Sequence, residues 1–158
     1  LEMVETEYCG WMHADLQQNV SVLLDALKLL KISNLKRANE RLAFKGLRTG
    51  RSPLENLFTV GAAIFASTLF LKKFWDIAGQ PNIFKKSELK FLDNAPNDHT
   101  FEFYVYINYL RYHGKFIRFD APFYKRRFGI SSWDKGFISK LSHAKLIFKY
   151  ILFLRFYS

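Results

Sequence analysis

The sequence predicts a mainly α-helical protein, whose N-terminal half packs around one buried helix and whose C-terminal half is basic. Apolar residues between Leu16 and Leu30 recur at the spacing of one helical face. A helix-start signal at Ser52 precedes a predominantly apolar run at 57–71. Hydrophobic residues make up 49% of the 158 residues, which is enough for a buried core. We expect a helical core and association region at 1–95 and a basic nucleic-acid-binding region at 96–158.

The first two expected helices cover 15–30 and 34–45. The first, DLQQNVSVLLDALKLL, is amphipathic with a single apolar face. The second, NLKRANERLAFK, has Ser33 as its N-cap and carries bases outside its apolar positions. These bases are predicted to form an exposed nucleic-acid-binding face: Lys36, Arg37, Arg41 and Lys45. Glycines then mark a loop at 46–53.

The third expected helix spans about 53–77 and is the predicted centre of the N-terminal half. Ser52, Pro53 and Glu55 match an N-cap, a proline at the first helical position and a capping-box glutamate. The fifteen-residue apolar run is shorter than the roughly 20 residues that a membrane-spanning helix needs. We therefore expect a buried helix, with Ile64 and Phe65 in the core, and do not expect a membrane as partner.

The C-terminal half is predicted to contain three more helices. FEFYVYINYLRYH at 101–113 has a helical apolar face, although its aromatic content also allows a strand. KFIRF at 115–119 is expected to be extended. A helix is then expected from Asp120 to Gly129 and another from Ser131, where Asp134 completes a second capping box.

This order of elements resembles the winged helix-turn-helix family over about 101–148, with FGISSWDKGFISKLSHAKLI as the turn and recognition helix. The resemblance implies that the helix at 131–143 enters a major groove of double-stranded DNA. The groove-facing candidates are Ser132, Trp133, Lys135, Ser139, Lys140 and His143. The phosphate-binding candidates are Lys125, Arg126 and Arg127. The expected wing is incomplete, because IFKYILFLRFYS contains no turn residue and supplies at most one strand or a last helix.

A fainter resemblance covers residues 45–110, which look like the non-catalytic N-terminal region of some insertion-sequence transposases. It is carried by the buried helical segment and by the Lys-rich stretch FKKSELKFLDN. The catalytic domain of those enzymes has no counterpart here. This resemblance implies a DNA-binding piece without a cleavage activity.

The net charge of +10 is concentrated in two blocks. Residues 28–51 hold eight bases and one acid, and residues 111–158 hold eleven bases and two acids. A surface charged only for solubility would mix both signs, so the pattern favours an anionic partner. We expect nucleic acid, with DNA favoured over RNA, bound by neutralisation of its phosphates. A homo-oligomer formed through the N-terminal half is a further expectation.

Catalytic and metal-binding patterns are missing from the sequence, so we expect no enzyme, no cofactor and no metal site. The four histidines have no paired spacing, and the acids in DNAPNDHTFE are typical of turns and caps. The lone Cys9 and an acidic N-terminus favour an intracellular location, in the cytoplasm or, in a eukaryote, the nucleus. The alternative is a helical protein–protein interaction or scaffold module whose basic patches contact an acidic protein or an anionic membrane surface.

Overall fold

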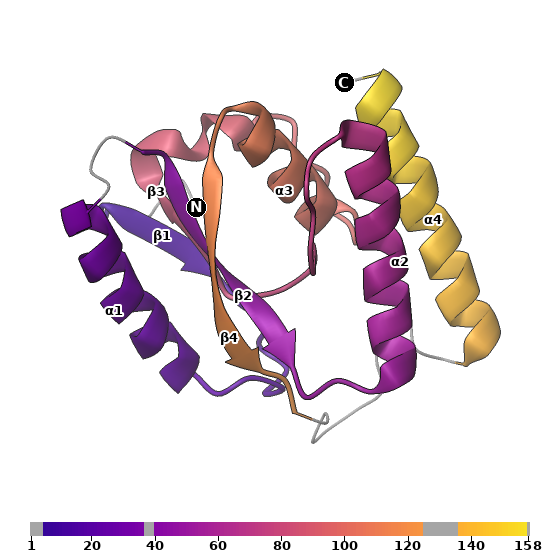
Figure 1. Cartoon of the computed structure of the whole chain (residues 1–158), viewed down its shortest axis with the longest axis horizontal. Helices are drawn as coiled ribbons and strands as arrows, with labels where there is room; N and C mark the ends of the chain where they lie inside the picture. Colours follow the sequence, from indigo (N-terminus) through magenta and orange to yellow (C-terminus); the bar gives the residue numbers. More distant parts are fainter. Residues whose placement is uncertain (1–4, 37–39, 125–135, 158) are drawn as a thin grey trace.

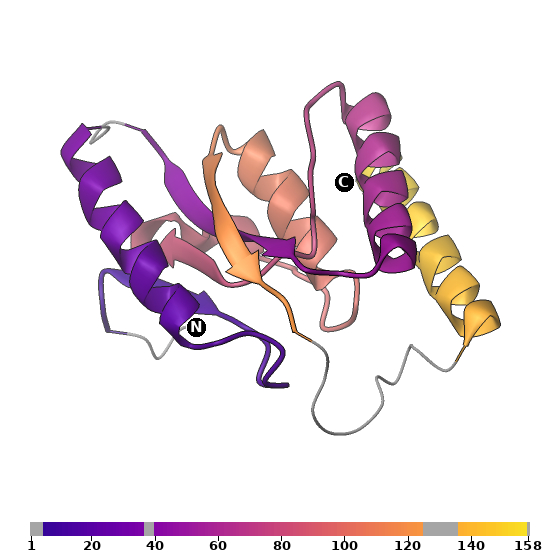
Figure 2. The same cartoon turned by 60° about the horizontal axis from the view of Figure 1, so that its bottom comes forward.

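A four-stranded mixed sheet lies at the centre of the protein, with helices on both sides (Figures 1 and 2). The computed structural model describes residues 5–36, 40–124 and 136–157. The strands are β1 (Tyr8–Trp11), β2 (Leu42–Thr49), β3 (Asn82–Lys85) and β4 (Lys115–Pro122). The helices are α1 (Ser21–Lys36), α2 (Pro53–Phe70), α3 (Phe101–Arg111), α4 (Phe137–Phe156) and the 3-10 helix η1 (Lys86–Leu92).

The strand order is β1-β3-β2-β4, and the long parallel pair β2–β4 holds the sheet together. This pair runs in register from Leu42 opposite Lys115 to Thr49 opposite Pro122. β3 is antiparallel to both of its neighbours. Because parallel strands need a long crossover connection, the chain passes through α2, β3, η1 and α3 between β2 and β4.

Side chains alternate between the two faces of the sheet and meet different helices on each. Phe44 and Ile83 pack with Ala26 of α1 on one face. Their neighbours Ala43 and Phe84 pack with α3 on the other face. A third cluster joins α3 to the paired helices α2 and α4, which lie side by side at the edge of the molecule away from α1 (Figure 1). The sheet therefore separates α1 from the other three α-helices.

The expectation of a mainly α-helical fold was wrong, because the protein is mixed α/β. The error lies in the segment 34–45, which was expected to be a helix. Instead, α1 continues to Lys36 and β2 begins at Leu42. All residues from Leu42 to Gly46 are buried, since this strand has neighbours on both edges and helices on both faces. Such a strand has no polar alternation to mark it in the sequence.

Helix α2 begins as predicted but is not the central buried helix. Its capping box is complete, because Ser52 and Glu55 bond to each other's backbone N–H groups. The helix ends at Phe70, earlier than the expected residue 77. Its buried residues are Ala63 and Ala66, whereas Ile64 is 59% exposed and Phe65 is half-buried. The expected burial of Ile64 was therefore wrong.

Two elements of the winged-helix expectation were also wrong within the described residues. Asp120 lies in β4 of the mixed sheet, so it does not cap a helix there. The expected recognition helix from Ser131 to His143 is replaced, in the described part, by α4, a single 20-residue helix starting at Phe137. IFKYILFLRF continues this helix and forms no wing strand. Residues 125–135, which hold the expected turn, lie outside the described residues.

Two expectations for the C-terminal half were confirmed in outline. The segment after Thr100 forms α3, and KFIRF lies within β4. The division into two regions, 1–95 and 96–158, stays a prediction. The sheet contains strands from both regions, because β2 pairs with β4.

Candidate functional site

Lys45 lies in a buried polar network between β2 and α3, away from any exposed basic face. Its Nζ donates to the carbonyl of Gly79 at 2.7 Å, to Oδ1 of Asn82 at 2.7 Å and to Oε2 of Glu102 at 3.1 Å. Burial lowers the pKa of Lys45 to about 8, although the negative charge of Glu102 opposes that shift. The prediction that Lys45 belongs to an exposed basic face was wrong, because its side chain is fully buried.

Glu102 is the acceptor at the centre of the same network. Its Oε1 accepts from Trp11 Nε1 at 2.8 Å and from Gln80 Nε2 at 2.7 Å. Its Oε2 accepts from Asn82 Nδ2 at 3.0 Å. Burial alone would raise the pKa of this carboxyl, but the Lys45 charge and the hydrogen bonds outweigh burial and lower it. The network therefore holds an ionised pair that ties α3 to the sheet.

A second ion cluster lies at the end of β2, where Arg48 meets Asp76. The backbone N–H of Arg48 donates to Asp76 Oδ2 at 2.8 Å, and its Nε donates to Oδ1 at 2.9 Å. Arg118 Nη2 lies 4.0 Å from Oδ2, and this guanidinium also donates to the carbonyls of Trp75 and Gly46. Burial opposes ionisation of Asp76, but the two arginines and the hydrogen bonds lower its pKa. The Asp76 carboxylate therefore interacts with the guanidinium groups of both Arg48 and Arg118.

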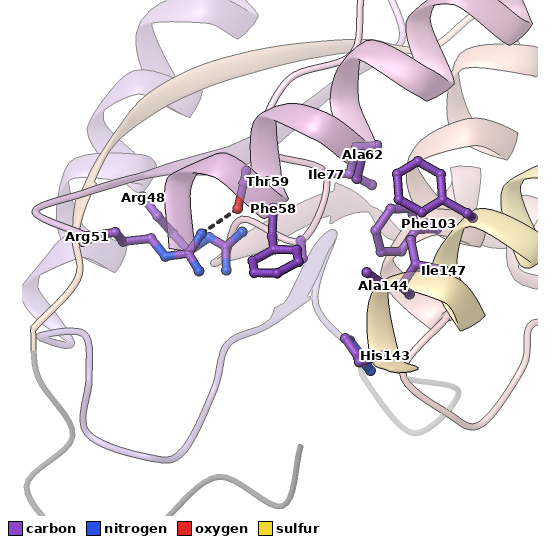
Figure 3. Close-up of a pocket in the computed structure, with 12 residues that line it drawn as sticks. Arg48, Arg51, Phe58, Thr59, Ala62, Ile77, Phe103, His143, Ala144 and Ile147 are labelled. Carbon is purple, nitrogen blue, oxygen red and sulfur yellow. Dashed lines mark hydrogen bonds between the residues drawn. The ribbon is translucent and has the colours of Figure 1, made fainter. Parts of the chain in front are cut away.

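Arg51, three residues further along, lines a pocket together with Arg48 (Figure 3). Its Nη1 donates to Thr59 Oγ1 at 2.6 Å, and both guanidinium groups lie within 6 Å of the Phe123 ring centre. Burial, followed by repulsion from Arg48, lowers the pKa of Arg51. Its buried Nε has no hydrogen-bond partner among the described residues. A buried donor left without an acceptor is costly, and the Nε of Arg118 in the neighbouring Asp76 cluster also has none among the described residues. Of these two arginines, Arg51 is the one that lines the pocket.

The pocket lies between the end of β2, the start of α2 and the first half of α4. Its apolar wall is built by Phe58, Ala62, Ile77, Phe103, Ala144, Ile147 and Phe148. His143 of α4 lies across from the arginines (Figure 3). Burial lowers the pKa of His143, and the nearby His99, whose ring centre is 5.2 Å away, lowers it further. The pocket thus combines an apolar wall with a cationic end.

Cations outnumber carboxylates around this pocket among the described side chains. Arg48 and Arg118 share Asp76, as described above. The charges of Arg51 and Lys140 act on the carboxylate of Glu55, which bonds to Ser52 in the capping box. Burial opposes ionisation of Glu55, but these hydrogen bonds and the two cations lower its pKa. Among the described side chains, these four cations outnumber the two carboxylates beside the α2 N-terminus, whose dipole also favours negative charge.

The structure brings few of the predicted binding residues together. Ser139, Lys140 and His143 lie in the first two turns of α4, and His143 lines the pocket. Arg41 is exposed and donates to the carbonyl of Tyr112 at 3.0 Å, away from this group. Outside the described residues lie the side chain of Lys36 and all of Arg37, Lys125, Arg126, Arg127, Ser132, Trp133 and Lys135.

Sequence analysis included Arg48 and Arg51 in a second basic patch at 36–51 but did not name them as binding residues; both line the pocket. The signal was present as the pair of bases in GLRTGRSP, immediately before the strong helix start at Ser52. Within the described part of the chain, no three His, Cys, Asp or Glu side chains gather as metal ligands would. Comparisons with protein-family models, with curated proteins and with solved structures found no match to this chain.

Proposed function

We propose that this chain is a non-enzymatic nucleic-acid-binding protein that holds backbone phosphates at the pocket formed by Arg48 and Arg51. The ligand groups would be phosphate oxygens, which arginine guanidinium groups bind through parallel N–H donors. The helix N-terminus beside Arg51 favours negative charge at the same place. The aromatic ring of Phe123 holds both guanidinium groups at one end of the pocket.

The unsatisfied Nε of Arg51 is the observation that carries this proposal. Arg48 is bound through its Nε and its backbone N–H to Asp76, so its charge is largely balanced. Arg51 has one donor bonded to Thr59, while its Nε has no acceptor among the described residues. A phosphate oxygen that entered the pocket could satisfy this donor if the Arg51 side chain turned toward it, because the Nε atom is buried in the free chain. It would also neutralise the surplus charge left by the two carboxylates.

The sequence that follows Phe123 is rich in positive charge. Phe123, which contacts both arginines, is followed directly by Tyr124, which is bonded to Gln17. The segment 125–135 starts there and leads to Gly136, one turn before Lys140 in α4. By sequence, the segment holds four bases and one acid. The segment itself lies outside the described residues, so these bases enter the proposal only as charge in the sequence.

The proposal concerns the nucleic-acid backbone and not base recognition. Base recognition was expected from a recognition helix at 131–143, and the fold does not contain that helix as predicted. The remaining argument is charge, and charge selects phosphates without regard to sequence. We therefore expect duplex DNA of different sequences to bind alike.

The test is a fluorescence-anisotropy titration of labelled random duplex DNA, single-stranded DNA and RNA at several salt concentrations. The account predicts binding that weakens linearly in log affinity against log salt between about 50 and 200 mM. Duplexes of unrelated sequence should give similar affinities. If the protein binds none of these at the lowest salt, or binds them with no salt dependence, the proposed function is wrong.

A further inference from the structure

We propose that the outer face of the α2–α4 pair docks on an anionic phospholipid surface. The pair lies side by side at one edge of the molecule (Figures 1 and 2). Both helices bury their inner sides in one cluster with α3, so their exposed sides share the outer side of the pair. This face is independent of the phosphate site proposed above.

The exposed stripe of α2 is apolar and uncharged. Leu57, Ile64 and Leu71 follow one another at seven-residue intervals, which places them along one side of the helix or at its C-cap. They are 66%, 59% and 87% exposed. Gly61 and Thr68 fill the positions between them. Isolated exposed apolar side chains are ordinary, but a continuous stripe of this kind marks a contact surface.

Helix α2 is also long enough and apolar enough to cross a membrane, by length and composition only, and 11% of that window is buried. The structure favours a position on the surface over a crossing. One side of α2 packs through Ala63 and Ala66, and its Phe65 ring contacts Phe148 of α4 at 4.7 Å between ring centres. A helix held against a protein core on one side has only its outer side available to lipid.

The exposed stripe of α4 mixes apolar side chains with lysines. Its members recur every three, four or seven residues: Ile138, Lys145, Lys149, Leu152 and Phe156. The helix carries four bases and no acid over its whole length. Lysines among leucine and phenylalanine side chains are typical of helices that lie in the headgroup region of a membrane. The positive charge complements anionic lipid.

Charge favours lipid over a second copy of the chain as the occupant. In a two-fold dimer through this face, each surface would meet the same surface of its partner. Lys145 and Lys149 of both copies would then be brought into one interface, with no acid on α4 to offset them. An anionic bilayer accepts both the apolar stripe and the lysines.

The experiment is flotation of the full chain with vesicles of phosphatidylcholine alone and of phosphatidylcholine mixed with phosphatidylserine. The parent should bind the mixed vesicles and bind pure phosphatidylcholine much more weakly. Ile64→Ser should weaken binding to the mixed vesicles by about tenfold, because it removes a side chain that the lipid would bury. Lys145→Gln and Lys149→Gln should each weaken it by about fivefold.

Matched controls lie on α1, across the sheet. Leu24 is as exposed as Ile64 and belongs to a second exposed apolar stripe, with Val20 and Leu27, and Lys28 is an exposed lysine. These controls therefore test whether lipid binds the α2–α4 face in particular, and Leu24→Ser and Lys28→Gln should bind vesicles like the parent. Arg51→Gln should also leave vesicle binding unchanged, which separates this proposal from the phosphate site. Sedimentation of the parent protein without lipid shows whether it forms a dimer. No binding to the mixed vesicles, equal losses in the α1 controls, or a dimer that Ile64→Ser dissociates would overturn the proposal.

Discussion

Lys45 of β2 and Glu102 of α3 form a buried ion pair, with 3.1 Å between Nζ and Oε2. The pair is 57 residues apart in sequence and joins the central strand to the helix that covers it. Asn82, Gln80 and Trp11 also donate hydrogen bonds to the carboxylate oxygens of Glu102, so the pair is held in one geometry. Its energetic role can be measured directly.

Replacing Lys45 with Met should lower the free energy of unfolding by about 3–5 kcal/mol, because Glu102 is left buried without its cation. Lys45→Met/Glu102→Leu should cost less than Lys45→Met, since no buried charge then remains. Urea denaturation monitored by circular dichroism measures both. Glu40→Gln is the matched control, as the Glu40–Lys115 pair is exposed and should contribute under about 1 kcal/mol. If Lys45→Met and Glu40→Gln lowered the free energy of unfolding by the same small amount, the stabilising role of the buried pair would be contradicted.

Stability should fall as the pH drops through the acid range. Asp76 and Glu102 both have a lower pKa in the folded protein than the ordinary values of 3.8 and 4.5. Below those values the unfolded chain binds protons that the folded chain does not, so protonation favours unfolding. The contribution is complete above pH 4.5 and is lost as the pH falls through the lowered folded values. In unfolding curves recorded at successive pH values, the free energy of unfolding of Asp76→Asn should fall less steeply over this window than that of the parent.

The capping box makes a local contribution that Ser52→Ala should remove, at a cost of about 1 kcal/mol. Ser52 accepts from the backbone N–H of Glu55, and the Glu55 carboxylate accepts from the backbone N–H of Ser52. Ser87, an exposed serine of η1, is the control, and Ser87→Ala should change stability by less than about 0.5 kcal/mol. An unchanged urea midpoint for Ser52→Ala would show that the cap does not stabilise α2.

Local signals predicted part of the fold, and contacts distant in sequence decided the rest. The start of α2 was predictable, because the bonds of Ser52 and Glu55 span three residues. β2 was not, because burial on both faces removes its alternation, and nothing near Lys45 in the sequence indicates Glu102 as its partner. The pocket was not predicted because Asp76 and Phe123 are distant in sequence from Arg48 and Arg51 and come close to them only when the chain folds.

The two sides of α2 should respond differently to substitution. Ile64 is 59% exposed, so Ile64→Ser should change the free energy of unfolding by less than about 0.5 kcal/mol. Ala66 is fully buried in the cluster with α3 and α4, so Ala66→Leu should destabilise by about 1–3 kcal/mol through overpacking. Thermal and urea unfolding of the two variants measure this difference. A large loss for Ile64→Ser would mean that the outer face of α2 is covered in the free protein.

The central claim is that Arg51 binds a nucleic-acid phosphate, and the most direct measurement is the salt dependence of duplex DNA binding by Arg51→Gln. The account predicts weaker binding to all sequences and a slope of log affinity against log salt reduced by about one unit. Lys28→Gln, which removes one exposed lysine of α1 paired with Asp25, should leave affinity and slope at the parent values. A normal unfolding curve for each variant shows that the fold is intact. If Arg51→Gln binds as the parent does, or if Lys28→Gln loses as much, the phosphate site at Arg51 is contradicted.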